Sequence, residues 1–140
     1  MDSHSPLIAI VDDEASICRA LLRLLRASKY RAEAFSSPLL FLESLAERVP
    51  DCVVLDLQMP AMTGVELQQQ LLLLPEPPPV IIVTARDDPR TRDRCLALGA
   101  IRYLRKPIEG GLFVDSIHEA VSARRKGPAL LEDATAGGRP

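Results

Sequence analysis

Four short apolar runs recur along this chain, and each is followed by polar residues of a different kind. The runs occupy residues 7–11, 52–55, 80–83 and 101–104. Runs of this length are typical of β-strands, and the first three are continuously apolar, as expected of strands buried on both faces. A further segment, residues 31–35, alternates polar and apolar positions and predicts a half-exposed edge strand.

Helical patterns alternate with these strands. They span about residues 17–25, 38–45, 64–74 and 89–99, and a last one starts near residue 110. The second and the fourth begin with a proline after a capping residue, which is a common helix start. The third has to stop at the four prolines between residues 75 and 79, and Gly99 is a suitable end for the fourth.

Aliphatic residues at helical spacing mark the helix faces that we expect to be buried. The predicted inward residues are Ile17, Leu21, Leu24 and Leu25, then Leu39, Leu42 and Leu45, and finally Leu112, Ile117 and Val121. Strands and helices that alternate in this way predict βαβ crossovers. The expected fold is therefore α/β, with a parallel sheet covered by helices on both faces.

Length and composition indicate one ordinary globular domain. The chain has 140 residues, and we expect the domain to occupy residues 1–126. Residues 127–140 are mostly small, polar or glycine, which is typical of a flexible tail or a truncated linker. The basic cluster Arg124-Arg125-Lys126 is interpreted as a helix end that complements the helix dipole, and not as a DNA site.

Charge, hydropathy and cysteine usage exclude several classes of protein. The formal net charge is only −2, so no strong field favours nucleic acid or an anionic membrane. No apolar run approaches the roughly 20 residues that span a bilayer. The amino terminus does not resemble a signal peptide. The three cysteines are odd in number and widely spaced, so we expect reduced thiols and a cytoplasmic protein.

The polar residues that follow the strands are candidates for one site. They are Asp12 and Asp13, Asp56, Thr84, and Lys106. Because the carboxyl ends of parallel strands meet at one edge of the sheet, where open α/β sheets bind ligands, these side chains should lie together. Each one alone has an ordinary explanation as a cap, a strand end or a solvated charge. Together they suit a Mg²⁺ ion and a phosphoryl group.

The chemistry of these residue types supports a phosphoacceptor. The carboxylate of Asp56 can attack phosphorus and form an acyl phosphate. Three neighbouring carboxylates repel one another, and Mg²⁺, which prefers oxygen ligands, would relieve that repulsion. Lys106 could pair with Asp56 or with a phosphoryl oxygen, and Thr84 could donate to another while the small Ala85 leaves room. Tyr103 is either core packing or a ring that moves inward with Thr84.

Four segments together resemble the receiver domain of bacterial response regulators, which belongs to the CheY-like superfamily. They are residues 10–14, 54–64, 82–85 and 106–107. The stretch Met59-Pro60-Ala61-Met62-Thr63-Gly64 is particularly similar to FixJ-type receivers, and the likeness runs from about Leu7 to Val121. The resemblance implies a doubly wound, five-stranded parallel sheet, a (βα)5 flavodoxin-like receiver with strand order 2-1-3-4-5.

The resemblance also implies a role for each candidate residue. Asp56 would be the phosphorylation site. The metal would be held directly by Asp13, Asp56 and the backbone carbonyl of Gln58, with Asp12 acting through water or as an orienting group. The residues that bind the phosphoryl group or respond to it would be Thr84, Ala85, Lys106 and Tyr103.

A receiver of this kind takes its phosphoryl group from a sensor histidine kinase. It catalyses only its own phosphorylation and dephosphorylation, with Mg²⁺ as cofactor and Mn²⁺ as a substitute. Its readout surface would combine the helix at 89–99, the strand at 101–104 and the helix from 110. The charges there suit a homodimer or are simply solvated. The expected target is an output domain missing from this chain or a separate partner, with no direct contact to nucleic acid or membrane.

Two other functions fit parts of the pattern. An aspartate-nucleophile phosphohydrolase shares the chemistry, but its nucleophile usually ends the first strand and is followed two residues later by a second aspartate. Here that second position is Gln58. The other alternative is a receiver-like docking module that works without phosphorylation, and the complete set of site residues argues against it.

Overall fold

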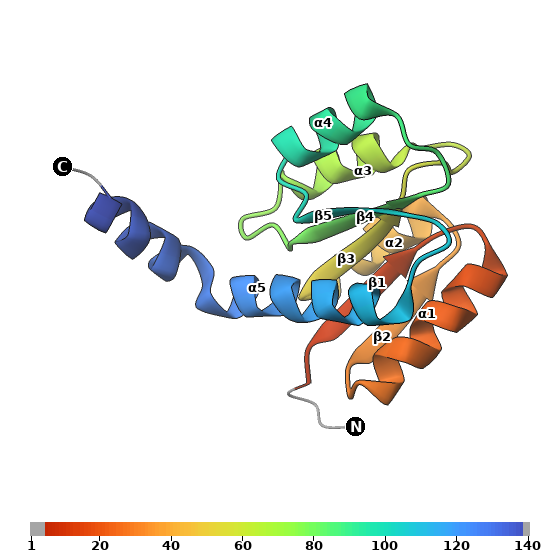
Figure 1. Cartoon of the computed structure of the whole chain (residues 1–140), viewed down its shortest axis with the longest axis horizontal. Coiled ribbons are helices and arrows are strands. Elements are labelled where there is room, and N and C mark those ends of the chain that lie inside the picture. Colours follow the sequence, from red (N-terminus) through yellow and green to blue (C-terminus); the bar gives the residue numbers. More distant parts are fainter. Residues whose placement is uncertain (1–4, 139–140) are drawn as a thin grey trace.

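Five parallel strands form the centre of the protein (Figure 1). The computed structural model describes the backbone of residues 5–138 and the side chains of residues 5–124. The strands are β1 (Leu7–Val11), β2 (Arg31–Phe35), β3 (Cys52–Asp56), β4 (Val80–Thr84) and β5 (Arg102–Arg105). Their order in the sheet is β2-β1-β3-β4-β5, and every pairing is parallel. The predicted fold class and strand order are confirmed.

Helices cover both faces of the sheet. They are α1 (Ala15–Ala27), α2 (Pro38–Ser44), α3 (Gly64–Leu71), α4 (Pro89–Ala97) and α5 (Gly110–Gly138). Figure 1 shows α1 and α5 on one side of the sheet and α3 and α4 on the other. Two apolar cores follow from this arrangement, one that joins α1 and α5 to the sheet and one that joins α2, α3 and α4 to it.

Alternate residues of each central strand enter the two cores. In β1, Ile8 and Ile10 pack into the core beneath α1 and α5, whereas Ala9 and Val11 pack into the core beneath the other three helices. All five positions of β1, β3 and β4 are buried, so the continuous apolar runs of the sequence correspond to strands without a solvent face.

Side-chain caps fix the starts of three helices. Ser37 caps α2 and Asp88 caps α4, each followed by a proline in the first turn. Thr63 and Glu66 form a reciprocal capping box at the start of α3. Gly99, with a φ of 101°, follows the end of α4 and confirms the predicted stop.

Two leucines predicted to face inward are exposed instead. Leu39 is 54% exposed and Leu112 is 49% exposed, whereas Phe41 and Phe113 are fully buried. In both helices the phenylalanine packs into the core and the predicted leucine lies on another face of the helix. In a leucine-rich helix several faces are apolar, so the sequence alone does not determine which face is turned toward the sheet.

The ends of three elements differ from the sequence prediction. Helix α3 ends at Leu71, earlier than the predicted residue 74, and residues 72–74 form tight turns that lead into the prolines. Strand β5 begins at residue 102 instead of 101. Helix α5 continues past the predicted boundary at residue 126 to Gly138, and the functional boundary of the domain stays a prediction. In the described part of the chain, no helix combines the length and apolarity needed to cross a membrane.

Gly64, the first residue of α3, allows this helix to approach β3 closely. A Cβ at this position would lie 2.7 Å from the Asp56 carbonyl oxygen and 2.9 Å from the Leu57 Cα. Both are backbone atoms, so a side chain here cannot be accommodated by a change of rotamer. Since the Gly64 amide also donates to the Leu57 carbonyl at 3.2 Å, the glycine fixes the loop that follows Asp56.

Gly64→Ala should therefore destabilise the fold by about 1–3 kcal/mol, the usual cost of overpacking. The free energy of unfolding from urea denaturation measures this. Gly110→Ala is the matched control, because its Cβ would meet only the Leu24 side chain, 3.5 Å away in ordinary van der Waals contact. Equal effects of the two substitutions would contradict the proposed role of Gly64.

Candidate functional site

The register of the sheet brings the polar strand ends together at its carboxyl edge. Val11 pairs with Leu55, so Asp12 and Asp56 follow neighbouring positions on β1 and β3. Asp56 in turn pairs with Val83, next to Thr84. Thr84 pairs with Arg105, and Lys106 follows directly. These pairings gather at one edge of the sheet residues that are up to 94 positions apart in the sequence, as in Asp12 and Lys106.

Three carboxylates form an acidic cluster at this edge. Asp12, Asp13 and Asp56 each offer an oxygen, and these atoms all lie within 4.8 Å of one another. Asp12 and Asp56 are buried, with 1% and 3% of their surfaces exposed, whereas Asp13 is exposed. The cluster therefore has two buried members and one that is open to solvent.

Lys106 supplies the positive charge beside this cluster. Its Nζ lies 2.9 Å from Asp12 Oδ2, 3.0 Å from Glu14 Oε1 and 3.7 Å from Asp56 Oδ2. Burial alone would lower the pKa of Lys106, but the nearby carboxylates of Asp12 and Glu14 outweigh burial and leave this pKa raised. The lysine is thus held as a cation, and the peptide bond that joins it to Pro107 is cis.

The charges do not balance within the site. Four carboxylates, those of Asp12, Asp13, Glu14 and Asp56, surround the single ammonium of Lys106. Burial raises the pKa of Asp56 to about 6, and the neighbouring Asp12 and Asp13 add to that rise, while the Gln58 amide and Lys106 oppose it. An additional cation would relieve the repulsion and favour the ionised form of Asp56.

The buried oxygens of the cluster fit a metal ion. Asp12 Oδ2 is buried and has no hydrogen-bond partner of good geometry, although it pairs electrostatically with Lys106. Asp12 Oδ1 accepts from the Glu14 amide at 2.9 Å, and Asp56 Oδ1 accepts from the Gln58 amide at 3.2 Å. Each buried aspartate thus has one oxygen fixed by backbone, and its second oxygen faces the other charges of the site.

Thr84 and Tyr103 meet at a single backbone carbonyl. The Thr84 hydroxyl donates to the Arg86 carbonyl at 3.0 Å and accepts from the Arg86 amide at 3.2 Å. The Tyr103 hydroxyl donates to the same carbonyl at 3.3 Å. Ala85, between these groups, is exposed and presents only a methyl group. The threonine is buried at the end of β4, and its hydroxyl is engaged within its own turn.

Two residues, Glu14 and Arg86, make contacts in the site that the sequence did not predict. Glu14 contacts Lys106, although its position at the start of α1 suggested only a cap. The Arg86 carbonyl links Thr84 to Tyr103. The run Asp12-Asp13-Glu14 could have signalled the first, because a third carboxylate adjoined the other two. No sequence pattern identifies a backbone carbonyl as a shared acceptor.

Comparison with known proteins places these features in one family. The sequence profile of the response regulator receiver domain matches residues 8–118. The response regulator protein TmoT of Ectopseudomonas mendocina is 31% identical over 86% of this chain and 55% of its own length. The transcriptional regulatory protein FixJ of Bradyrhizobium diazoefficiens is 30% identical over 92% of this chain and 62% of its own length. The chain thus spans about half the length of the curated relatives that it matches.

Solved structures show the same architecture. A response regulator receiver protein from Burkholderia phymatum superposes with a TM-score of 0.75 at 40% identity, covering 84% of this chain and 96% of the other. The response regulator StyR superposes with a TM-score of 0.78 at 34% identity, covering 93% of this chain and 67% of the other. A CheY-like receiver domain from Methanospirillum hungatei, at 24% identity and a TM-score of 0.80, supports the fold alone.

The raised pKa of Asp56 predicts a characteristic dependence of stability on pH. Between pH 3.8 and about 6 the folded state keeps a proton that the unfolded state has released. The stability of the metal-free protein should therefore fall as pH rises through this window. Asp56→Asn removes the charge, so at about pH 7.5 it should stabilise the metal-free protein by on the order of 1–3 kcal/mol.

Urea denaturation of both proteins in a chelator, at several pH values, measures this effect. The exposed residue Asp93 on α4 provides the control, and Asp93→Asn should change the stability by less than about 0.5 kcal/mol. If Asp56→Asn is only as stable as wild type at pH 7.5, ionised Asp56 does not destabilise the folded protein, and the prediction is wrong.

Proposed function

The chain belongs to the family of response regulator receiver domains, and on this premise we propose that Asp56 is the phosphoacceptor of a two-component system. The supporting observation is a buried aspartate within 4.8 Å of two further carboxylates, with the ammonium of Lys106 close by. A metal cation would relieve the repulsion between the carboxylates, and this cation and the Lys106 ammonium would attract the oxygens of a phosphoryl group.

The proposed reaction is a transfer from a phosphohistidine of a sensor histidine kinase. A carboxylate oxygen of Asp56 attacks phosphorus and forms the new O–P bond, while the N–P bond breaks and its electron pair stays on the imidazole. Lys106 stabilises the negative charge on the phosphoryl oxygens as they arrive. Hydrolysis of the acyl phosphate by water returns the domain to its starting state, so it turns over only its own modification.

Mg²⁺ is the proposed cofactor, and Mn²⁺ should substitute for it. Asp13, Asp56 and the Gln58 backbone carbonyl would hold the ion, and Asp12 would act through water. Two observations support this set: the clustered carboxylate oxygens, and a buried Asp12 oxygen that lacks a hydrogen bond of good geometry. When bound, the ion would supply charge neutralisation for the carboxylates and for the phosphoryl oxygens.

Phosphorylation would be read out through Thr84 and Tyr103. For Thr84 to donate to a phosphoryl oxygen, its hydroxyl has to leave the Arg86 carbonyl, and the methyl group of Ala85 leaves space for the phosphoryl group. Tyr103 loses its partner when the same carbonyl moves, so its ring can turn inward. The shared carbonyl therefore couples the site to β5 and to the start of α4.

The proposed setting is a cytoplasmic signalling pathway. The chain matches about half the length of TmoT, so an output domain joined to the receiver, or a separate partner, would receive the signal. We assign no direct contact with nucleic acid or membrane to the receiver itself. The alternative, a docking module independent of phosphorylation, predicts no modification of Asp56 and is tested by the same experiment.

A homodimer through α4, β5 and α5 is the proposed active assembly. This surface carries exposed charges of both signs, and two of them, Arg102 and Glu119, pair at 2.8 Å within one chain. An exposed ion pair of this kind contributes little to the stability of the fold. Replacing it by the same pair formed between two chains, across a two-fold axis, would therefore cost little free energy. Movement of Tyr103 in β5 would alter the same surface.

Acetyl phosphate with Mg²⁺ should add one phosphoryl group to the wild-type protein, as measured by intact-mass spectrometry. Asp56→Asn should remain unlabelled, because an amide cannot form the acyl phosphate, and a chelator should prevent labelling of wild type. The control Asp93→Asn should be labelled like wild type. Equal labelling of Asp56→Asn would refute the assignment, and unlabelled wild type would favour the docking module.

Beryllofluoride with Mg²⁺ should convert the monomer to a dimer, as measured by native mass and sedimentation. The double reversal Arg102→Glu with Glu119→Arg keeps the pair within the chain and should still dimerise. Arg102→Glu alone should weaken the dimer, because it places two carboxylates together. An oligomeric state that is unchanged by beryllofluoride would rule out the proposed assembly.

A further inference from the structure

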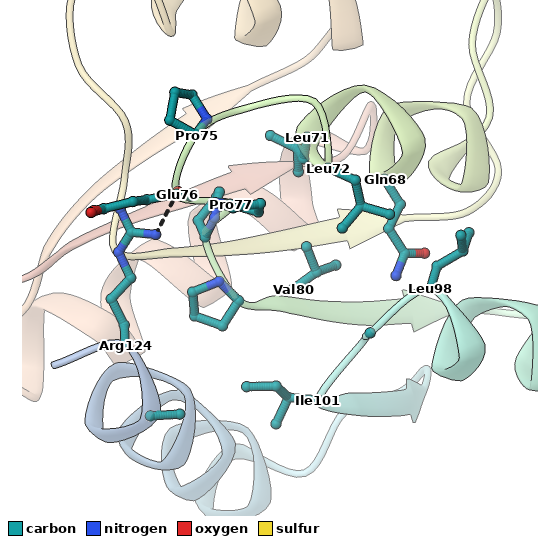
Figure 2. Close-up of a pocket in the computed structure, with 14 residues that line it drawn as sticks. Gln68, Leu71, Leu72, Pro75, Glu76, Pro77, Val80, Leu98, Ile101 and Arg124 are labelled. Atoms are coloured by element: carbon teal, nitrogen blue, oxygen red, sulfur yellow. Dashed lines mark hydrogen bonds between the residues drawn. The ribbon is translucent and has the colours of Figure 1, made fainter. Parts of the chain in front are cut away.

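An apolar groove of about 390 Å³ lies at the amino-terminal edge of the sheet, opposite the phosphoacceptor site (Figure 2). Val80, which opens β4, lines the groove, whereas Thr84, which closes β4, belongs to the site. The two regions are separated by the length of one strand, roughly 13 Å at the usual rise per residue. None of the residues assigned to phosphorylation lines the groove.

The groove has the size and composition of a small-molecule site. Such sites usually enclose 300–1,000 Å³ and combine an apolar lining with a few polar groups. Here the ends of α3 and α4, the start of β4 and the side of α5 supply mainly leucine, proline, valine and isoleucine side chains. Leu72, at the rim, is 46% exposed and adds apolar surface to the groove.

A stiff loop forms one wall of the groove. Four of the five residues from Pro75 to Pro79 are prolines, and each fixes its own φ and limits the residue before it. The loop therefore loses little conformational freedom when a ligand binds. Preorganisation of this kind favours affinity, because the entropy of ordering the site is already lost on folding.

Arg124 places a cation at the mouth of the groove. Arg124 donates from Nη1 to the Glu76 carbonyl at 2.9 Å, and among the described residues it forms no ion pair. In Figure 2 the Glu76 carboxylate lies beside the Arg124 guanidinium, on the side away from Val80 and Ile101. The remaining guanidinium N–H groups of Arg124 are thus available to an anionic group beside an apolar wall.

We propose that this groove binds a small amphiphile, an aromatic or aliphatic ring system that carries one anionic group. The ring would lie against Val80, Ile101 and Leu98, and the anion would meet Arg124. The proposal does not depend on phosphorylation of Asp56. The groove would be a second binding site of the receiver, separate from the phosphoacceptor site, and its ligand would contact residues at the ends of α3 and α4.

Two fluorescent probes that differ in charge test the proposal: 1-anilinonaphthalene-8-sulfonate and the neutral N-phenyl-1-naphthylamine. Ala123→Trp should fill the groove and lower the affinity for both probes by about tenfold or more. Arg124→Gln should lower the affinity for the anionic probe alone, by about three- to tenfold, as expected when a partly exposed charge pair is lost. Arg23→Gln, an exposed arginine on α1, is the matched control and should leave both affinities unchanged.

Amide chemical shifts locate the bound probe and show that each variant is folded. Shifts concentrated at Val80, Leu98 and Ile101 support the groove. Shifts concentrated around the exposed Leu39 and Leu40 on α2 would place the probe elsewhere and overturn the proposal. It is overturned equally if Ala123→Trp leaves both affinities unchanged, or if Arg124→Gln affects the two probes alike.

Discussion

Repulsion between buried carboxylates is the constraint around which this domain is organised. Parallel register places Asp12 and Asp56 on adjacent strands, and apolar packing on both faces of the sheet keeps them there. Lys106 compensates only part of their charge and lies closer to Asp12, at 2.9 Å, than to Asp56, at 3.7 Å. Asp56 is thus the less compensated of the two, and burial together with the neighbouring carboxylates raises its pKa. The fold holds this group in an unfavourable state that an added cation would relieve.

The backbone around Asp56 makes this placement rigid. On one side the aspartate belongs to a strand with no solvent face, and on the other it leads into a loop held against Gly64. Gln58 donates to one carboxylate oxygen and so orients the other toward the charged groups. A carboxylate with a fixed direction loses little entropy when it reacts, so this rigidity would favour the proposed transfer to Asp56.

The sequence predicts the sheet and the site better than the helix faces and the groove. Strands such as Val80–Thr84 are buried on both faces, so an unbroken apolar run identifies them directly, and the polar residue that ends each run marks the site. Leu39 and Leu112 show where this reasoning stops, because a leucine-rich helix has several apolar faces and a neighbouring phenylalanine decides between them. The contacts of the Arg86 carbonyl and of Arg124 arise from the backbone path and from residues distant in sequence, which residue types alone do not reveal.

Helix α4 lies between the two proposed binding regions. Only Cys95 is buried among its nine residues, whereas α1 buries three, so moving α4 disturbs little apolar packing. The loop before its first turn contains the Arg86 carbonyl that Thr84 and Tyr103 share, and residues just after its last turn line the groove. Between these points, the Gln68 side chain on α3 donates to the Cys95 carbonyl at 2.9 Å and ties the middle of the helix to the core. A shift that starts at Thr84 can therefore pivot α4 about this bond and change the groove at its other end.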